Sequence, residues 1–173
     1  MVIDPESADT FIAGYKMLLS EAHRLAGGRS SPNLLRTLAS GREAVRANPE
    51  LLGQAVACLE ESGERLSSDV RRAMGSLRLR QWVYLKDTTK YSIFIAPEEN
   101  EAFGVVGLTD RIRNILGGAA VTFRAGVVEY QGKYVCDGIL ESHMWLGPNY
   151  KREYNSMFAA LKREGRFRVA CEP

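Results

Sequence analysis

Two runs of β-branched and aromatic residues constrain the fold of this chain most strongly. The runs Val121–Tyr130 and 133–140 flank the dipeptide Gln131-Gly132. Residues of these types favour a pleated, half-buried strand. A two-residue link that ends in glycine is typical of a tight hairpin turn. We therefore expect residues 121–140 to form an antiparallel hairpin.

A two-residue turn also sets the register of the hairpin. It predicts four directly opposed pairs along one face: Glu129 with Tyr134, Val127 with Cys136, Ala125 with Gly138, and Phe123 with Leu140. This face is mostly apolar, so we expect it to pack into the core. The opposite face mixes charged and β-branched residues. We expect that face to be partly covered or to form an interface.

Strand-like composition also occurs before and after the hairpin. Three segments before it are rich in aromatic and β-branched residues: 81–86, 91–95 and 103–108. Residues 111–116 follow a capping pair and predict one short helix. After the hairpin, residues 166–171 alternate charged with apolar side chains, which predicts a final edge strand.

Cap-and-proline signals mark the longer helices. Asp4-Pro5, Ser31-Pro32 and Asn48-Pro49 each precede apolar residues at helical spacing, and a fourth, shorter helix is expected near 67–69. Asn149 is expected to cap the last helix, after a loop at 145–148. The sequence therefore predicts an α+β fold. A helical region (1–78, about four helices) leads into an antiparallel β-sheet packed against a C-terminal helix (79–173), as one compact unit.

Composition indicates that the chain is globular and in which compartment to expect it. The 173 residues are 45% hydrophobic and carry a formal net charge of +2. No apolar run approaches the roughly 20 residues that span a bilayer, and no basic-then-apolar leader begins the chain. Three unclustered cysteines do not resemble a disulfide framework. We therefore expect a cytoplasmic protein in a reducing environment, without a membrane partner.

Four segments resemble a group of uncharacterised prokaryotic proteins. They read Leu-Ser-Ser-Asp-Val at 66–70, Trp-Val-Tyr-Leu-Lys at 82–86, Val-Val-Gly-Leu-Thr-Asp at 105–110, and Tyr-Gln-Gly-Lys-Tyr-Val-Cys-Asp-Gly-Ile at 130–139. The resemblance covers about 66–167 and is most specific at the hairpin. It implies an α+β domain of prokaryotic origin, and it implies no activity and no site residues.

Three residues around the end of the hairpin are the candidates for catalysis. Asp137 beside Gly138 could act as a base, and Cys136 with His143 could form a nucleophile and its base. The structural alternative pairs Asp137 with Arg124 across the hairpin, with Gly138 permitting a bulge. The predicted register turns Cys136 toward the apolar face, which disfavours thiol chemistry.

Metal and cofactor sites have little support in the sequence. The two histidines, His23 and His143, lie far apart in the chain, and no paired Cys or His spacing typical of a metal site occurs. The Gly27-Gly28 and Gly117-Gly118 pairs lack the context of a dinucleotide or phosphate loop. We therefore expect neither a metal nor a cofactor.

Basic residues gather near the C-terminus. They are Lys151, Arg152, Lys162, Arg163, Arg166 and Arg168. With Tyr150 and Tyr154 among them, they could hold a nucleic acid through phosphate contacts and stacking. A solvated face, partly balanced by nearby acids, explains them as well, and the modest net charge favours that explanation.

Three functional hypotheses remain from the sequence. The leading one is a non-catalytic interaction or scaffold domain, with a protein partner or a second copy as the partner. Nucleic-acid binding through the C-terminal basic surface is the second. A small enzyme that uses Asp137 with Cys136 or His143 is the third.

Overall fold

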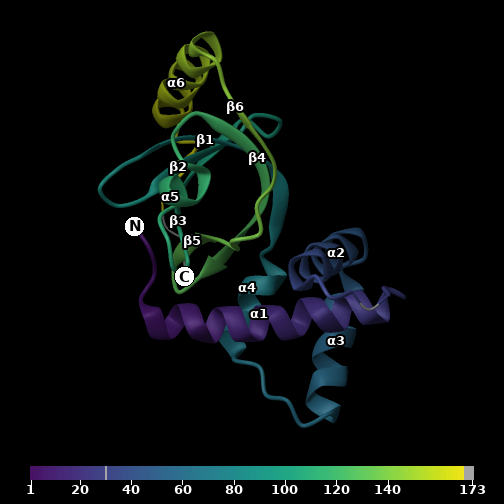
Figure 1. The fold of residues 1–173 in the computed structure, drawn as a ribbon. Coiled ribbons are helices and arrows are strands. Elements are labelled where there is room, and N and C mark those ends of the chain that lie inside the picture. Colours follow the sequence, from purple (N-terminus) through teal and green to yellow (C-terminus); the bar gives the residue numbers. More distant parts are fainter. Residues whose placement is uncertain (30, 170–173) are drawn as a thin grey trace. The chain divides into compact units, whose positions relative to one another are not determined.

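The computed structural model describes residues 1–29 and 31–169, which divide into two compact units (Figure 1). Residues 5–77 form a helical unit. Residues 1–4 join the segment that starts at Arg78 in a second unit, which contains the sheet. The two units together confirm the α+β fold predicted from the sequence.

Four helices make up the helical unit: α1 (Pro5–Leu25), α2 (Leu34–Ala47), α3 (Glu50–Glu61) and α4 (Ser68–Gly75). The long helix α1 packs against the other three. Its buried stripe has the spacing of one helix face and consists of Ala8, Phe11, Tyr15, Leu18, Leu19 and Ala22. All four helices lie in regions where the sequence predicted a helix.

The start of α2 differs from the prediction. The N–H of Arg36 donates to the side-chain oxygen of Asn33 at 3.1 Å, so Asn33 is the N-cap. The hydroxyl of Ser31, the predicted cap, accepts the N–H of Asn33 at 3.2 Å. Ser31 therefore stabilises the turn that leads into the helix, and the cap moves two residues along the chain.

Five strands of the second unit close into a barrel. They are β1 (Arg78–Asp87), β2 (Ser92–Ala96), β3 (Glu101–Val106), β4 (Val121–Tyr130) and β5 (Lys133–Cys136). Their order is β1-β2-β3-β5-β4, and an additional pairing of β1 with β4 completes the ring. Strand β3 pairs with β5 in the parallel direction, whereas the predicted sheet was antiparallel. This parallel pair lets the barrel close.

Aromatic side chains fill the barrel. Trp82, Phe94, Phe103 and Phe123 are fully buried, and edge-to-face contacts join Trp82 to Phe103 and Phe94 to Phe123. The Trp82 indole N–H donates to the carbonyl of Ala125 at 2.9 Å, so its buried polar group is paired. The short helix α5 (Ile112–Leu116) lies between β3 and β4 in the chain and adds its two buried residues to this core.

The C-terminal helix α6 (Pro148–Arg163) packs on the outer face of the barrel, as the sequence predicted. Leu161 is buried there with Val83, Ile93 and Ile95 from β1 and β2. The two-residue strand β7 (Phe167–Arg168) pairs with β3 beside it. The helix begins after an N-cap at Gly147 instead of at Asn149, because Pro148 suits the first helical position. No helix among the described residues is both long and apolar enough to cross a membrane.

The predicted hairpin holds for half its length and then leaves its register. The pairs Val127–Cys136 and Glu129–Tyr134 are confirmed. The pairs predicted for Gly138 and Leu140 do not form, because β5 ends at Cys136. Gly138 adopts a left-handed φ of +79°, which turns the chain away from β4.

A strand that was not predicted follows this turn. Strand β6 (Glu141–Trp145) returns to β4, with Glu141 opposite Arg124 and Trp145 opposite Val121. His143 therefore lies in a strand. The side chains of Phe123, Val127 and Cys136 face the barrel core as predicted, and Leu140 packs against that core while partly exposed.

Candidate functional site

The three candidate catalytic residues occupy different environments. Cys136 is 1% exposed and lies within the barrel core. Asp137 is buried at the turn, and His143 is exposed on β6. A reactive thiol needs solvent access and a base within hydrogen-bond reach. Burial of Cys136 opposes that chemistry.

Asp137 has a structural contact that explains its position. Its carboxylate accepts the backbone N–H of Ile139 at 3.0 Å, while its own N–H donates to the carbonyl of Gly126 at 2.9 Å. An aspartate that bonds two residues ahead stabilises a turn. Arg124 forms an ion pair at 3.3 Å with Glu141, which is the first residue of β6. The geometry around Asp137 is therefore that of a turn that redirects the chain from β5 to β6.

The C-terminal basic residues are divided between α6 and the segment around β7. Arg168 forms an ion pair with Glu101 at 2.6 Å, and the guanidinium of Arg166 donates to the carbonyl of Glu99 at 3.0 Å. These contacts use two of the six basic side chains to hold β7 against the barrel. The other four lie exposed on α6: Lys151, Arg152, Lys162 and Arg163.

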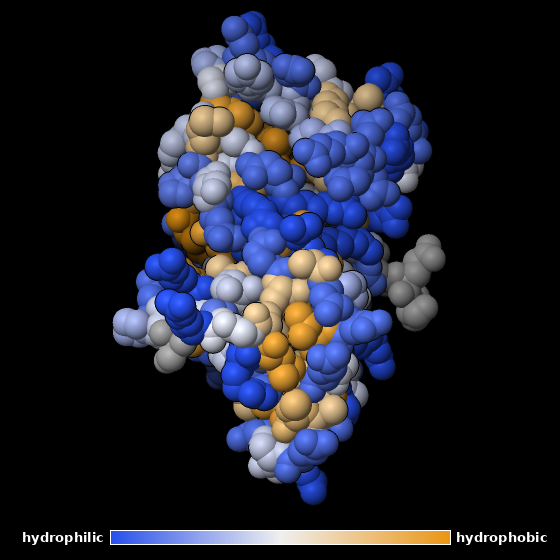
Figure 2. Space-filling model, turned by 90° about the vertical axis from the view of Figure 1, so that its right-hand side faces the viewer, coloured by the Kyte–Doolittle hydropathy of each residue, from blue (hydrophilic) through white to orange (hydrophobic). Residues whose placement is uncertain are grey.

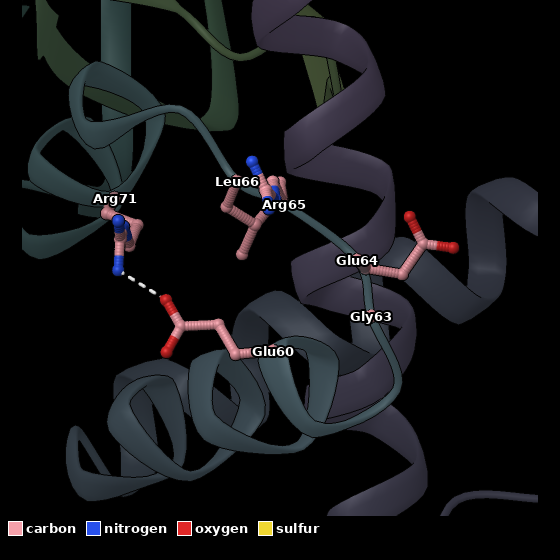
Figure 3. A pocket seen from close by; sticks show the side chains of 6 residues that line it. All are labelled: Glu60, Gly63, Glu64, Arg65, Leu66 and Arg71. Atoms are coloured by element: carbon pink, nitrogen blue, oxygen red, sulfur yellow. Dashed lines mark hydrogen bonds and ion pairs between the residues drawn. The ribbon is translucent and has the colours of Figure 1, made fainter.

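A depression of about 470 Å³ lies in the helical unit, beside the loop between α3 and α4 (Figure 3). Arg71 and Glu60 form an ion pair at 2.6 Å across it, while the side chain of Glu64 points away from that pair. Both charged partners are about half exposed, and such pairs are screened by water. The depression is open to solvent, and two of the charged side chains that line it, Glu60 and Arg71, pair with each other. No cluster of three or more metal-ligating side chains occurs within residues 1–29 and 31–169.

Strand β6 is exposed on both of its faces. Met144 is 62% exposed and Trp145 is 54% exposed, although neighbouring residues of a strand point to opposite faces. We call these two side chains the edge patch. One edge of β6 pairs with β4, and no other strand in the described part of the chain pairs with the second edge. In an otherwise closed barrel, β6 is thus an exposed edge that carries large apolar side chains.

The backbone contacts of β6 show which residues point outward. The N–H of Leu146 donates to the carbonyl of Ala120, next to β4, at 2.9 Å. Backbone groups of successive strand residues point to alternate edges, so Met144 also directs its N–H and C=O toward β4. His143 and Trp145 then direct theirs toward the unpaired edge. These two residues offer the hydrogen-bonding groups that another strand could use.

The indole of Trp145 is held against backbone. A Cβ added to Gly118 would lie 2.6 Å from two ring atoms of Trp145, so the ring lies directly over that glycine. Tyr150, in the first turn of α6, is 58% exposed as well. Sequence reasoning missed this surface because it placed residues 145–148 in a loop. The adjacent Met144 and Trp145 could have indicated this surface, because they lie in a segment for which the sequence predicts no packing partner.

Apolar side chains also reach the surface of the helical unit (Figure 2). Leu34 and Leu35, at the start of α2, are 50% and 55% exposed. Leu34 and Leu35 form a pair of adjacent exposed apolar residues, as Met144 and Trp145 do, and exposed apolar residues alone are common on protein surfaces. This second surface lacks the unpaired strand edge that distinguishes β6.

Comparison with known proteins identifies no relative of this chain. No family model matches it, and no curated protein or solved structure does so either.

Proposed function

We propose that this chain is a non-catalytic interaction domain that binds another protein chain through β6 and the edge patch. The observation that carries the proposal is an unpaired strand edge whose Met144 and Trp145 are more than half exposed. An open strand edge offers backbone groups that can pair with another strand, and exposed apolar side chains beside it favour a contact there. Tryptophan is also enriched among the residues that dominate binding energy in protein interfaces.

Two further features support a role in binding over catalysis. The barrel core is filled by aromatic side chains, and the thiol of Cys136 lies within it.

Cys58 and Cys136 are both free cysteines, which favours a reducing cytosol as the compartment of the protein. We keep a prokaryotic cell as the proposed source, on the hairpin residues at 130–139 that carry the resemblance.

Photo-crosslinking in the cells that make the protein tests the proposal. A photoreactive amino acid replaces Met144 in one variant and Glu98, an exposed residue of the link between β2 and β3, in the control. We expect adducts of higher mass from position 144 and not from position 98. Equal yields at the two positions, or no adduct at position 144, would contradict a contact surface on β6.

A second candidate function is binding of single-stranded nucleic acid, and one observation favours it. Five strands close into a barrel in the order β1-β2-β3-β5-β4, and five-stranded barrels of the OB type bind oligonucleotides or oligosaccharides over strands 2 and 3. Fold alone does not establish function. In this chain α6 covers the outer face where Ile93 and Ile95 lie, which leaves the exposed basic side of α6 as the surface for a nucleic acid.

Salt dependence tests this second candidate. Binding of a labelled oligonucleotide should weaken steeply as salt rises, and Lys151→Glu together with Lys162→Glu should weaken it further. Each single reversal, Lys151→Glu or Lys162→Glu, has Lys16→Glu in the helical unit as its matched control. No binding at low salt would reject the candidate and leave the proposal for β6 untouched.

A further inference from the structure

We infer that the partner of β6 is a second copy of this chain, whose own β6 pairs antiparallel with it about a twofold axis at Met144. The inference rests on the proposed function and names the partner of that surface. It follows from the alternation of backbone groups along β6 and from the side chains on its two faces.

The backbone of β6 is complementary to itself. His143 and Trp145 direct their N–H and C=O groups outward, as the contact between Leu146 and Ala120 requires. In an antiparallel pair centred on Met144, each His143 lies opposite the second copy's Trp145. Directly opposed residues whose groups point at each other exchange two hydrogen bonds. The dimer contains two of these His143–Trp145 pairs, and together they use all the outward N–H and C=O groups of both residues.

The side chains fit the same register. The two Met144 residues face each other at the axis, in a position without mutual hydrogen bonds, where opposed Cα atoms approach to about 4.5 Å. Both side chains are mostly exposed in the single chain and would shield each other from water. Methionine adapts its shape to an irregular contact. On the other face, each Trp145 ring lies beside the second copy's His143.

The pairing is also limited in length. Ser142 has a φ of +49°, which departs from strand geometry, so the regular part of the edge is His143–Trp145. A symmetric contact of the same edge on both copies closes on itself and gives a dimer instead of a fibre. So short a contact belongs to the small, weak class of interfaces, with a dissociation constant on the order of micromolar or higher.

Sedimentation velocity of the full chain across a concentration series, from about 10 μM to about 1 mM, tests the inference. We expect a monomer–dimer equilibrium for the wild type. In Met144→Glu two carboxylates would face each other at the axis, and in Met144→Lys two ammonium groups would do so, and we expect either variant alone to be monomeric. An equimolar mixture of the two should restore the dimer, because unlike charges then meet.

Leu35→Glu is the matched control, since it places the same charge at an apolar residue of the helical unit that is also more than half exposed. We expect it to dimerise like the wild type. The inference is overturned if the wild type remains monomeric throughout, if mixing the two Met144 variants restores nothing, or if Leu35→Glu abolishes the dimer and Met144→Glu does not. Adducts to other proteins from position 144 beside a strictly monomeric wild type would overturn the second copy and keep the proposed function.

Discussion

The Cα of Gly41 lies so close to Leu19 that a Cβ at that position would be 2.0 Å from the Leu19 carbonyl oxygen. Helices α1 and α2 therefore meet backbone to backbone at this point. Only glycine permits this approach, because any side chain would separate the two helices. The contact lies within the helical unit, where α1 is the central element.

Gly41→Ala should destabilise the helical unit, because α2 must move away from α1 to admit the methyl group. We expect a loss of about 1–3 kcal/mol, the usual cost of overpacking. Urea unfolding followed by circular dichroism measures it. Gly53→Ala on α3 is the control, since nothing lies within 4 Å of its added Cβ, and it should stabilise by about 0.5–1 kcal/mol. Equal effects of the two substitutions would contradict the close approach.

Tyr84 should make the barrel sensitive to alkaline pH. Burial, and then the hydrogen bond from its hydroxyl to Asp87 at 2.9 Å, raise the pKa of Tyr84 above its usual value. With the folded pKa above the unfolded one, this contribution to stability is complete below about pH 10 and is lost as pH rises further.

The variant Tyr84→Phe checks this dependence. It should cost about 1–3 kcal/mol near neutral pH, because Asp87 loses one donor and keeps the hydroxyl of Ser92 at 2.7 Å. Its free energy of unfolding should fall less between about pH 9 and pH 11 than that of the wild type. Urea unfolding at a series of pH values measures both. A parallel decline of the two proteins would show that Tyr84 does not contribute.

Gly118 and Trp145 should behave as a coupled pair. Gly118→Ala forces the indole of Trp145 off the backbone, because the new Cβ would lie 2.6 Å from the ring. We expect the substitution to destabilise by about 1 kcal/mol in the wild type and by less in a Trp145→Ala background. A double-mutant cycle from urea unfolding measures the difference. Equal costs in the two backgrounds would mean that the ring is not seated on Gly118.

Leu161 should anchor α6 to the barrel. It is the one fully buried residue that the described structure gives for this helix, at 1% exposed. Leu161→Ala should cost about 2–5 kcal/mol and raise amide hydrogen exchange throughout α6. The exposed neighbour Lys162→Ala should change stability by less than about 0.5 kcal/mol. Unchanged exchange in Leu161→Ala would indicate that other contacts seat the helix.

Local signals gave most of the fold. The helix starts at Pro5 and Glu50 follow from proline and capping chemistry, which operates within a few residues. The hairpin turn at Gln131-Gly132 follows from its two-residue length, and both of its residues have positive φ.

What the sequence did not reveal depends on residues far apart in the chain. The ring closes through β1 with β4 and through the parallel pair of β3 with β5, and no short window of sequence encodes either pairing. The end of β5 was missed because Asp137 and Gly138 were read as strand residues with a bulge. In the structure they form a turn that leads into β6. The edge patch was missed because the sequence predicted a loop at residues 145–148.

The parallel pairing of β3 with β5 has a consequence for the order in which the chain can mature on the ribosome. All of the helical unit is synthesised before β1 begins. The ring of strands cannot close until Val135, the last residue that joins β5 to β3, has been synthesised. Val2 likewise cannot pair until its bridge partner Gly107 has been synthesised. Such distant pairings slow folding, so β1 and β2 should emerge as an open ribbon that nascent-chain chaperones can recognise.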